Sequence, residues 1–276
     1  MTVGEVLTAS TEFLAAKGVP TPRVDAEHLV ARALGVSRLD LYLHHDRPLN
    51  EAELAAAREL VRRRGTREPL AYVLGDWGFR RLVLATDRRA LVPRPETEVV
   101  VERCLARLQG IESPRVLDVG TGSGAIALAI ADEHPGARVT AIDVSADALA
   151  LARENAERTG LSVTLVEHDL AAGLPGGPYD LVVSNPPYVL PEEIDTLEAE
   201  VRDWEPRRAL VGRGATEAIV AAAPAVLEPG GRLVLEVGDG TAEAVAALLG
   251  EAGFRDVVRT PDLTDRDRVV EGQWAP

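Results

Sequence analysis

A predicted strand, a glycine-rich turn and a predicted helix follow one another over residues 116–131 and limit the folds open to this chain. The apolar residues on either side of the turn indicate a buried strand and a helix. Gly120, Gly122 and Gly124 let the backbone take positive φ angles and approach a ligand closely. Asp143 follows the next predicted strand, roughly 20 residues beyond the glycines, where an acid can accept hydrogen bonds from both hydroxyls of a ribose.

This loop does not by itself identify the cofactor. Gly120, Gly122 and Ala125 satisfy the dinucleotide fingerprint G-x-G-x-x-G/A, and an acid follows at the expected distance. A nicotinamide enzyme therefore stays open on the loop alone.

A second motif ends the predicted strand 179–184 with the residues Asn185, Pro186, Pro187 and Tyr188. The prolines stop the strand and have no N–H to donate. An Asn side chain and a bare carbonyl then stand at the carboxyl end of a strand, where open α/β sheets build their sites. A planar nitrogen with two hydrogens, an amide or an aromatic amine, could donate one to each. A simple Asn–Pro turn is the alternative, and the second proline, the aromatic residue and the upstream glycine loop disfavour it.

The chain of 276 residues divides into three predicted segments. Residues 1–75 carry apolar residues at helical spacing and predict a small helical domain. Residues 76–92 alternate loosely and predict a β-hairpin connector. From 93 to 276 helices and strands alternate, which predicts a doubly wound parallel sheet. The late strands are expected near 231–237, 254–259 and 268–271.

The net charge of −14 disfavours non-specific binding to nucleic acid, which needs a broad basic face. The one dense basic run comprises Arg62, Arg63 and Arg64, with Arg58 and Arg67 beside it. This run is either a solvated helix face or a docking surface for an RNA-rich or acidic partner.

Cys104 is the single cysteine, so no intramolecular disulfide can form and a reducing compartment is favoured. Its apolar neighbours predict a buried helix residue without a catalytic role. The five histidines are scattered without the spacing of metal ligands, so no metal site is expected. No segment has the pattern of a signal peptide or a transmembrane helix. We expect a soluble, cytoplasmic protein, not bound to a membrane, that is a monomer.

Several stretches resemble the peptide-chain release factor glutamine methyltransferases over nearly the whole chain. They are DAE at 25–27, EPLAYVLG at 68–75, LVPRPETE at 91–98, NPPY at 185–188, EPR at 205–207 and LEVG at 235–238. The NPPY motif alone is shared with adenine amino-methyltransferases, whereas LVPRPETE and EPLAYVLG are much more specific.

The resemblance implies a Rossmann-like class I methyltransferase sheet, S-adenosylmethionine as cofactor, and methylation of the Gln side-chain nitrogen in the Gly-Gly-Gln motif of release factors. By matching position, the cofactor would contact Gly120, Thr121, Gly122, Ser123, Gly124, Asp143, Asp169, Leu170 and Asn185. Of these, Asp143 would hold the ribose, and Asp169 and Leu170 would line the adenine. The catalytic residues would be Asn185, Pro186 and Tyr188, and the substrate would also contact Pro187 and Phe79. Phe79 and the stretch Arg94–Glu98 would close the pocket near the sulfonium.

An amide nitrogen is a poor nucleophile because its lone pair is delocalised into the carbonyl. The motif contains no strong base, so such a site must act by positioning the nitrogen, which can contribute up to roughly 7–11 kcal/mol.

The chain departs from the family pattern at two places. The connector has Arg81, Leu82 and Leu84 where the family usually has Gly-Leu and then an aromatic residue. Residues 211–216, which include Ala215, replace a usual Gly-Gly-x-Asp-Gly. Both departures bear on the substrate side of the site. A paralogue that methylates another protein amide, an adenine amino-methyltransferase acting on nucleic acid and a non-catalytic binding module therefore remain alternatives.

Overall fold

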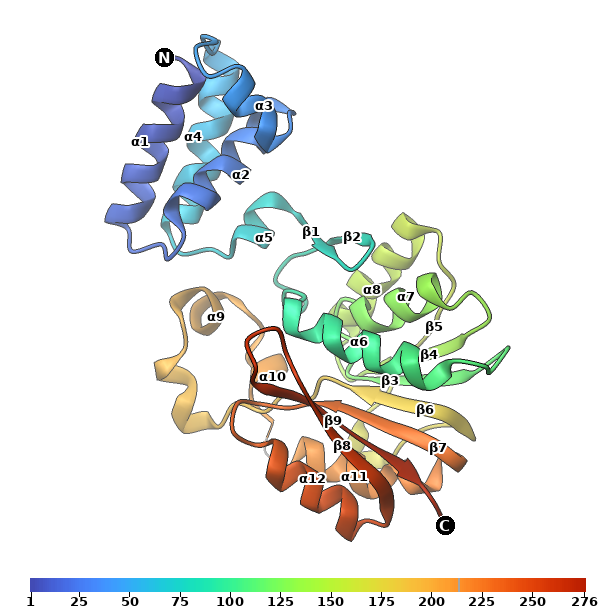
Figure 1. Ribbon diagram of the computed structural model, residues 1–276. Helices are drawn as coiled ribbons and strands as arrows, with labels where there is room; N and C mark the ends of the chain where they lie inside the picture. Colours follow the sequence, from blue (N-terminus) through green and yellow to red (C-terminus); the bar gives the residue numbers. More distant parts are fainter. Residues whose placement is uncertain (213) are drawn as a thin grey trace. The chain divides into compact units, whose positions relative to one another are not determined.

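The computed structural model describes residues 1–212 and 214–276, which form two compact units (Figure 1). The helical unit consists of residues 1–76 and 198–204. The sheet unit consists of residues 77–197 and 205–276. The helical unit thus includes a short segment from the second half of the chain, which the sequence pattern did not indicate.

The helical unit contains short amphipathic helices with well-formed ends. They are α1 (Val3–Ala16), α2 (Pro22–Leu34), α3 (Arg38–Leu43), α4 (Glu51–Gly65), α5 (Leu70–Leu74) and α9 (Ala199–Trp204). Thr2 and Asn50 each begin a helix with a capping box, which satisfies backbone N–H groups that have no partner within the helix. Gly35 ends α2 at φ 66°, in the left-handed region that glycine adopts without strain.

The basic run at the end of α4 is held by carboxylates of the same unit. Arg63 contacts Glu68 at 2.5 Å. Arg64 is 4% exposed, and its Nε donates to Asp25 at 2.6 Å. A second nitrogen of Arg64 lies 2.8 Å from Glu200 of α9. The predicted basic face, whether solvated or docking, is therefore wrong for Arg64, which is an interior residue.

The sheet unit holds a mixed seven-stranded sheet in the order β5-β4-β3-β6-β7-β9-β8. Its strands are β3 (Arg115–Val119), β4 (Arg138–Asp143), β5 (Thr164–Glu167), β6 (Tyr179–Ser184), β7 (Leu227–Glu236), β8 (Phe254–Pro261) and β9 (Asp267–Trp274). The first five strands in this order are parallel, whereas β9 is antiparallel to both β7 and β8. One strand of the predicted parallel sheet, β9, is thus antiparallel, because a short turn joins β8 to β9 and short turns connect antiparallel strands.

Helices cover both faces of this sheet, as Figure 1 shows. They are α6 (Pro95–Leu108), α7 (Ala125–Glu133), α8 (Ala146–Thr159), α11 (Ala215–Ala222) and α12 (Ala242–Glu251), and the short helix α10 (Arg207–Leu210) precedes α11 in the chain. Val116 of β3 packs in a core with α6 and α7, and the next residue, Leu117, packs in a second core with α11 and α12. Successive residues of one strand therefore face opposite layers, which confirms the predicted doubly wound α/β class with a small N-terminal helical domain.

Shorter elements complete the structure. They are the two-stranded sheet of β1 (Asp76–Phe79) and β2 (Leu82–Ala85), and the 3₁₀ helices η1 (Leu170–Ala172), η2 (Pro191–Thr196) and η3 (Ala223–Ala225). Cys104 is fully buried in α6, and burial raises the pKa of its thiol, as expected for an unreactive core residue.

The strand order changes direction between β3 and β6, because β4 and β5 lie on one side of β3 and β6 and β7 on the other. Val119 is paired in register with Ser184 at this point. The glycine loop after β3 and the motif after β6 therefore emerge side by side at the carboxyl edge, the usual place for a ligand site.

Candidate active site

A cavity of about 350 Å³ lies at this switch point within the sheet unit. Most of the residues predicted for the site line it, namely Gly120, Thr121, Gly122, Ser123, Asp143, Asp169, Leu170, Asn185, Pro186 and Pro187. These residues come from the carboxyl ends of four neighbouring strands and the loops that follow them. The fold thus brings together positions that lie far apart in the sequence.

The glycine loop has the backbone geometry that its sequence predicts. Gly120 and Gly122 have φ angles of 74° and 56°, which other residues rarely adopt. The amides of Gly120 and Thr121 both donate to the carbonyl of Ile142, at 2.8 and 2.9 Å. The loop is therefore tied to the end of β4.

Gly124 has a different place from the other two loop glycines. It is the N-cap of α7 at φ 83° and is not among the residues that line the cavity. A Cβ here would lie 3.2 Å from side-chain atoms of Ala152 and Leu128. Gly124 thus permits close packing of α7 against α8.

Asp143 lies at the end of β4 and its carboxylate organises the adjoining backbone. One oxygen accepts the Gly122 N–H at 2.9 Å, and the other accepts the Ser145 N–H at 2.9 Å. Each carboxylate oxygen has a further lone pair, so Asp143 can still accept hydrogen bonds from a ligand in the cavity.

Asp118 lies beneath the loop and was not singled out from the sequence. It is fully buried, and burial raises the pKa of its carboxyl to about 7, although the Thr121 hydroxyl donates to it at 2.6 Å and opposes this shift. Asp118 is not among the lining residues, so it supports the loop from below.

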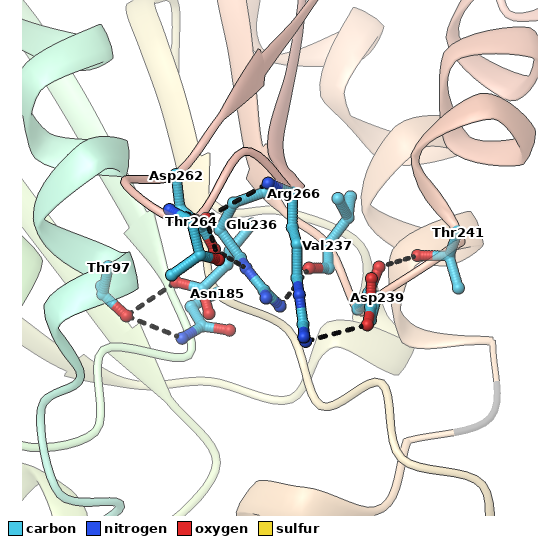
Figure 2. A network of polar contacts seen from close by, with 11 residues as sticks. Thr97, Asn185, Glu236, Val237, Asp239, Thr241, Asp262, Thr264 and Arg266 are labelled. Carbon is cyan, nitrogen blue, oxygen red and sulfur yellow. Dashed lines mark hydrogen bonds and ion pairs between the residues drawn. The ribbon is translucent and has the colours of Figure 1, made fainter.

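The side-chain nitrogen of Asn185 donates to the hydroxyl of Thr97 at 3.3 Å. That hydroxyl in turn donates to a carboxylate oxygen of Glu236 at 2.7 Å (Figure 2). Figure 2 shows the Asn185 nitrogen on the side of Thr97 and the oxygen turned away from it. The oxygen is therefore the atom that Asn185 can offer as an acceptor to a ligand.

Of the other two residues in this network, Thr97 belongs to the stretch Arg94–Glu98 that was expected to close the pocket, whereas Glu236 was not expected at the site. Thr97 lies in the first turn of α6 and lines the cavity, and Glu236 is the last residue of β7. Burial raises the pKa of Glu236 to about 7. The only signal for Glu236 was its presence in the LEVG stretch.

Tyr188 and Phe79 are not among the residues that line this cavity. Tyr188 is 40% exposed, and a Cβ added at Gly238 would lie 3.1 Å from its ring. Phe79 is 1% exposed and belongs to the hydrophobic core with Leu84 and Val100. The expectation that Phe79 closes the pocket is therefore corrected, because its ring packs in the hydrophobic core next to β1 and β2.

The departures from the family pattern fall in different surroundings. Arg81 forms an exposed ion pair with Asp132 at 2.9 Å, and Leu84 is fully buried in the core. Val211 and Ala215 line the cavity, while Arg213 lies outside the described residues. Only the second departure thus reaches the cavity wall.

Arg94 links two of the stretches that carry the resemblance. Its guanidinium lies 2.6 Å from Glu205, which is buried. Burial raises the pKa of the Glu205 carboxyl, and the charge of Arg94 opposes that shift. The pair joins the start of α6 to the segment 205–207, and Arg94 and Pro206 both line the cavity.

Within residues 1–212 and 214–276, no group of three or more His, Cys, Asp or Glu side chains could hold a metal ion. Across the same residues, no helix combines the length and the hydropathy needed to span a bilayer.

Comparison with known proteins gives two family models that match this chain. Residues 5–75 match the PrmC N-terminal domain and residues 97–201 match the methyltransferase small domain. The chain also resembles the solved T. thermophilus 16S rRNA N2 G1207 methyltransferase with a TM-score of 0.53, covering 72% of this chain and 49% of that one. At 20% identity this likeness shows the fold alone, that of a class I methyltransferase.

Two curated relatives are similar over nearly their whole length. The release factor glutamine methyltransferase of Geobacter sulfurreducens is 44% identical, covering 99% of this chain and 96% of the relative. That of Deinococcus radiodurans is also 44% identical, covering 100% of this chain and 99% of the relative. This chain therefore belongs to the release factor glutamine methyltransferase family.

Proposed function

We propose that the protein transfers a methyl group from S-adenosylmethionine to the side-chain amide nitrogen of the Gln in the Gly-Gly-Gln motif of a peptide chain release factor. The observation that carries this proposal is that Asn185 and Pro186 share one cavity with the glycine loop and Asp143. Two hydrogen-bond acceptors suited to a planar NH₂ group, the Asn185 side-chain oxygen and the Pro186 carbonyl, thus lie next to a loop suited to a nucleoside cofactor.

The residues present fit that cofactor. The loop glycines leave room beside the backbone, Asp143 keeps free acceptor positions for ribose hydroxyls, and Asp169 and Leu170 line the same cavity. When bound, S-adenosylmethionine supplies an electrophilic methyl group on its sulfonium.

The chain's own contribution is to position the substrate nitrogen. The Asn185 oxygen accepts one amide hydrogen and the Pro186 carbonyl accepts the other, which fixes the plane of the amide and the direction of its lone pair. The methylated nitrogen is acidic and loses one proton to solvent, so no protein base is required. Positioning of this kind can contribute up to roughly 7–11 kcal/mol.

The decisive experiment combines labelled S-adenosylmethionine with purified protein and a release factor, and maps the label by mass spectrometry. We expect label on the Gly-Gly-Gln glutamine and none on a release factor with that Gln replaced by Ala. Label on another protein amide would indicate the paralogue, and no transfer despite cofactor binding would indicate a binding module.

An adenine amino-methyltransferase is the second candidate, because it would use the same NPPY motif. It would need a surface that binds phosphates, which the net charge of −14 disfavours. Methyl transfer to bare duplex DNA at the rate seen with a release factor would favour this candidate instead.

We further propose that the helical unit docks the release factor and that the protein works as a cytoplasmic monomer without direct sequence-specific contact to nucleic acid. The match of residues 5–75 to a family-specific domain supports a docking role. Amide hydrogen exchange in this unit should slow when release factor is added, and no protection would contradict docking. Light scattering would reveal a dimer, and cell fractionation would test the location.

Replacing Asp143 with alanine should weaken S-adenosylmethionine binding by about 1.5–3 kcal/mol, because charge-assisted bonds to the ribose are lost. Calorimetry measures this directly. Asp147→Ala is the matched control, since Asp147 is exposed in α8 and does not line the cavity. Unchanged affinity in the Asp143 variant, or tight NAD binding by the wild type, would contradict the cofactor assignment.

A further inference from the structure

We propose that Thr97 and Glu236 are positioning residues that hold the Asn185 amide with its oxygen toward the substrate and its nitrogen away from it. This inference rests on the proposed function and assigns a task to two residues that neither the motif nor the cofactor loop includes.

The three side chains come from three different elements. Asn185 follows β6, Thr97 lies in the first turn of α6, and Glu236 ends β7. Thr97 and Glu236 are 5% and 2% exposed, so water does not compete for their hydrogen bonds. The distances of 3.3 Å from Asn185 to Thr97 and 2.7 Å from Thr97 to Glu236 make a continuous chain (Figure 2).

The donors and acceptors in these hydrogen bonds, from Asn185 through Thr97 to Glu236, can be arranged in only one way. An ionised carboxylate accepts hydrogen bonds and cannot donate, so Glu236 takes the single hydroxyl proton of Thr97. The Thr97 oxygen then has only lone pairs left, and Asn185 must face it with its NH₂ group. The Asn185 oxygen is thereby left for the substrate.

Loss of the chain would leave both amide orientations open. Without the Glu236 carboxylate, the Thr97 hydroxyl could donate to the Asn185 oxygen instead, and the amide could turn over. The NH₂ group of Asn185 would then face the NH₂ group of the substrate, where two donors meet and no hydrogen bond forms. Catalysis would fail although the cofactor still bound.

The charges around Glu236 make the chain sensitive to pH. Burial raises the pKa of its carboxyl to about 7. The hydrogen bond from Thr97 and the charge of Arg268 of β9 both lower this pKa and oppose the shift. Glu96 raises this pKa further and Arg94 lowers it, both at the start of α6. Tyr188 also interacts with this carboxyl: burial raises the pKa of the Tyr188 hydroxyl, and the negative charge of Glu236 raises it further. Protonation below about pH 7 gives Glu236 a proton to donate, so the polarity of the chain is lost as the pH falls.

The first test compares Thr97→Val, which keeps the shape and removes the hydroxyl, with Thr97→Ser, which restores it. With a release factor as substrate at alkaline pH, we expect Thr97→Val to lower kcat about tenfold, the effect of about one hydrogen bond. The Kd of S-adenosylmethionine should not change, and Thr97→Ser should recover most of the activity. Thr241→Val is the matched control. The Thr241 hydroxyl donates to the carbonyl of Gly238 at 2.8 Å and takes no part in the hydrogen bonds that join Asn185, Thr97 and Glu236.

The second test follows pH. Wild-type kcat should rise with pH through an apparent pKa near 7, and Glu236→Gln should lose this dependence. The side-chain NH₂ signals of Asn185 in ¹⁵N NMR should shift with the same midpoint in the free protein, and they should move in Thr97→Val. This readout does not need a substrate.

The outcomes separate the two claims. If the wild type methylates a release factor and Thr97→Val does so with normal kcat, the positioning role is wrong and the proposed function stands. If the wild type transfers no methyl group, the proposed function is wrong and the amide signals decide the orientation of Asn185. Signals that neither titrate with Glu236 nor respond to Thr97→Val would overturn the inference.

Discussion

Asn185→Ala is expected to lower kcat by about a hundredfold or more, the scale seen when one preorganised contact to the reacting group is removed. The Asn185 oxygen is the acceptor that fixes one hydrogen of the substrate amide, and its nitrogen is already engaged by Thr97. Steady-state methylation of a release factor measures the effect, and calorimetry should show little change in cofactor affinity. Near-normal kcat in this variant would remove Asn185 from the active site.

Asn185→Asp separates positioning from proton transfer. A carboxylate keeps the acceptor oxygen but cannot donate to Thr97, so its orientation is no longer enforced by the hydrogen bond to that hydroxyl. We expect partial activity without a new pH optimum near the pKa of a carboxylic acid. A kcat above that of the wild type, with an acidic limb set by the new carboxylate, would mean that the site needs a base.

The second large effect concerns the stability of the helical unit. Arg64→Ala should lower the free energy of unfolding by about 3–5 kcal/mol, as expected when one partner of a buried ion pair is removed. Asp25 and Glu200 would lose the cation between them, and the carbonyl of Glu68 would lose its bond to Arg64 at 3.2 Å. Urea unfolding followed by circular dichroism measures this change.

Arg62→Ala is the matched control for this prediction. Arg62 precedes Arg64 by two positions in α4. Its side chain is 66% exposed, and its ion-pair partner Glu59 lies in the same helix. We expect an unchanged unfolding midpoint, since exposed ion pairs contribute little. Equal stability of the two variants would show that the Arg64 contacts do not hold this unit together.

Features that depend on neighbouring residues could be predicted from the sequence. The alternation of strands and helices, the positive φ angles of Gly120 and Gly122, and the end of β6 before Asn185 are consequences of local preference and apolar spacing. Open α/β sheets bind ligands at the carboxyl ends of their strands, and this general rule predicted that the glycine loop, Asp143 and Asn185 lie around one cavity. The antiparallel position of β9 did not follow from spacing, because periodicity does not state which strands pair.

Features that depend on contacts between distant segments were decided by the tertiary structure. Thr97 lies 88 residues from Asn185 and 139 from Glu236, so no local pattern states that one hydroxyl joins them. Arg64 belongs to a run that looks solvated, yet Asp25 and Glu200 enclose it from both sides. Phe79 was expected to close the pocket, but its ring packs in the core. In each case the sequence supplies the chemical group, and the fold decides whether a carboxylate, an apolar core or the cavity becomes its partner.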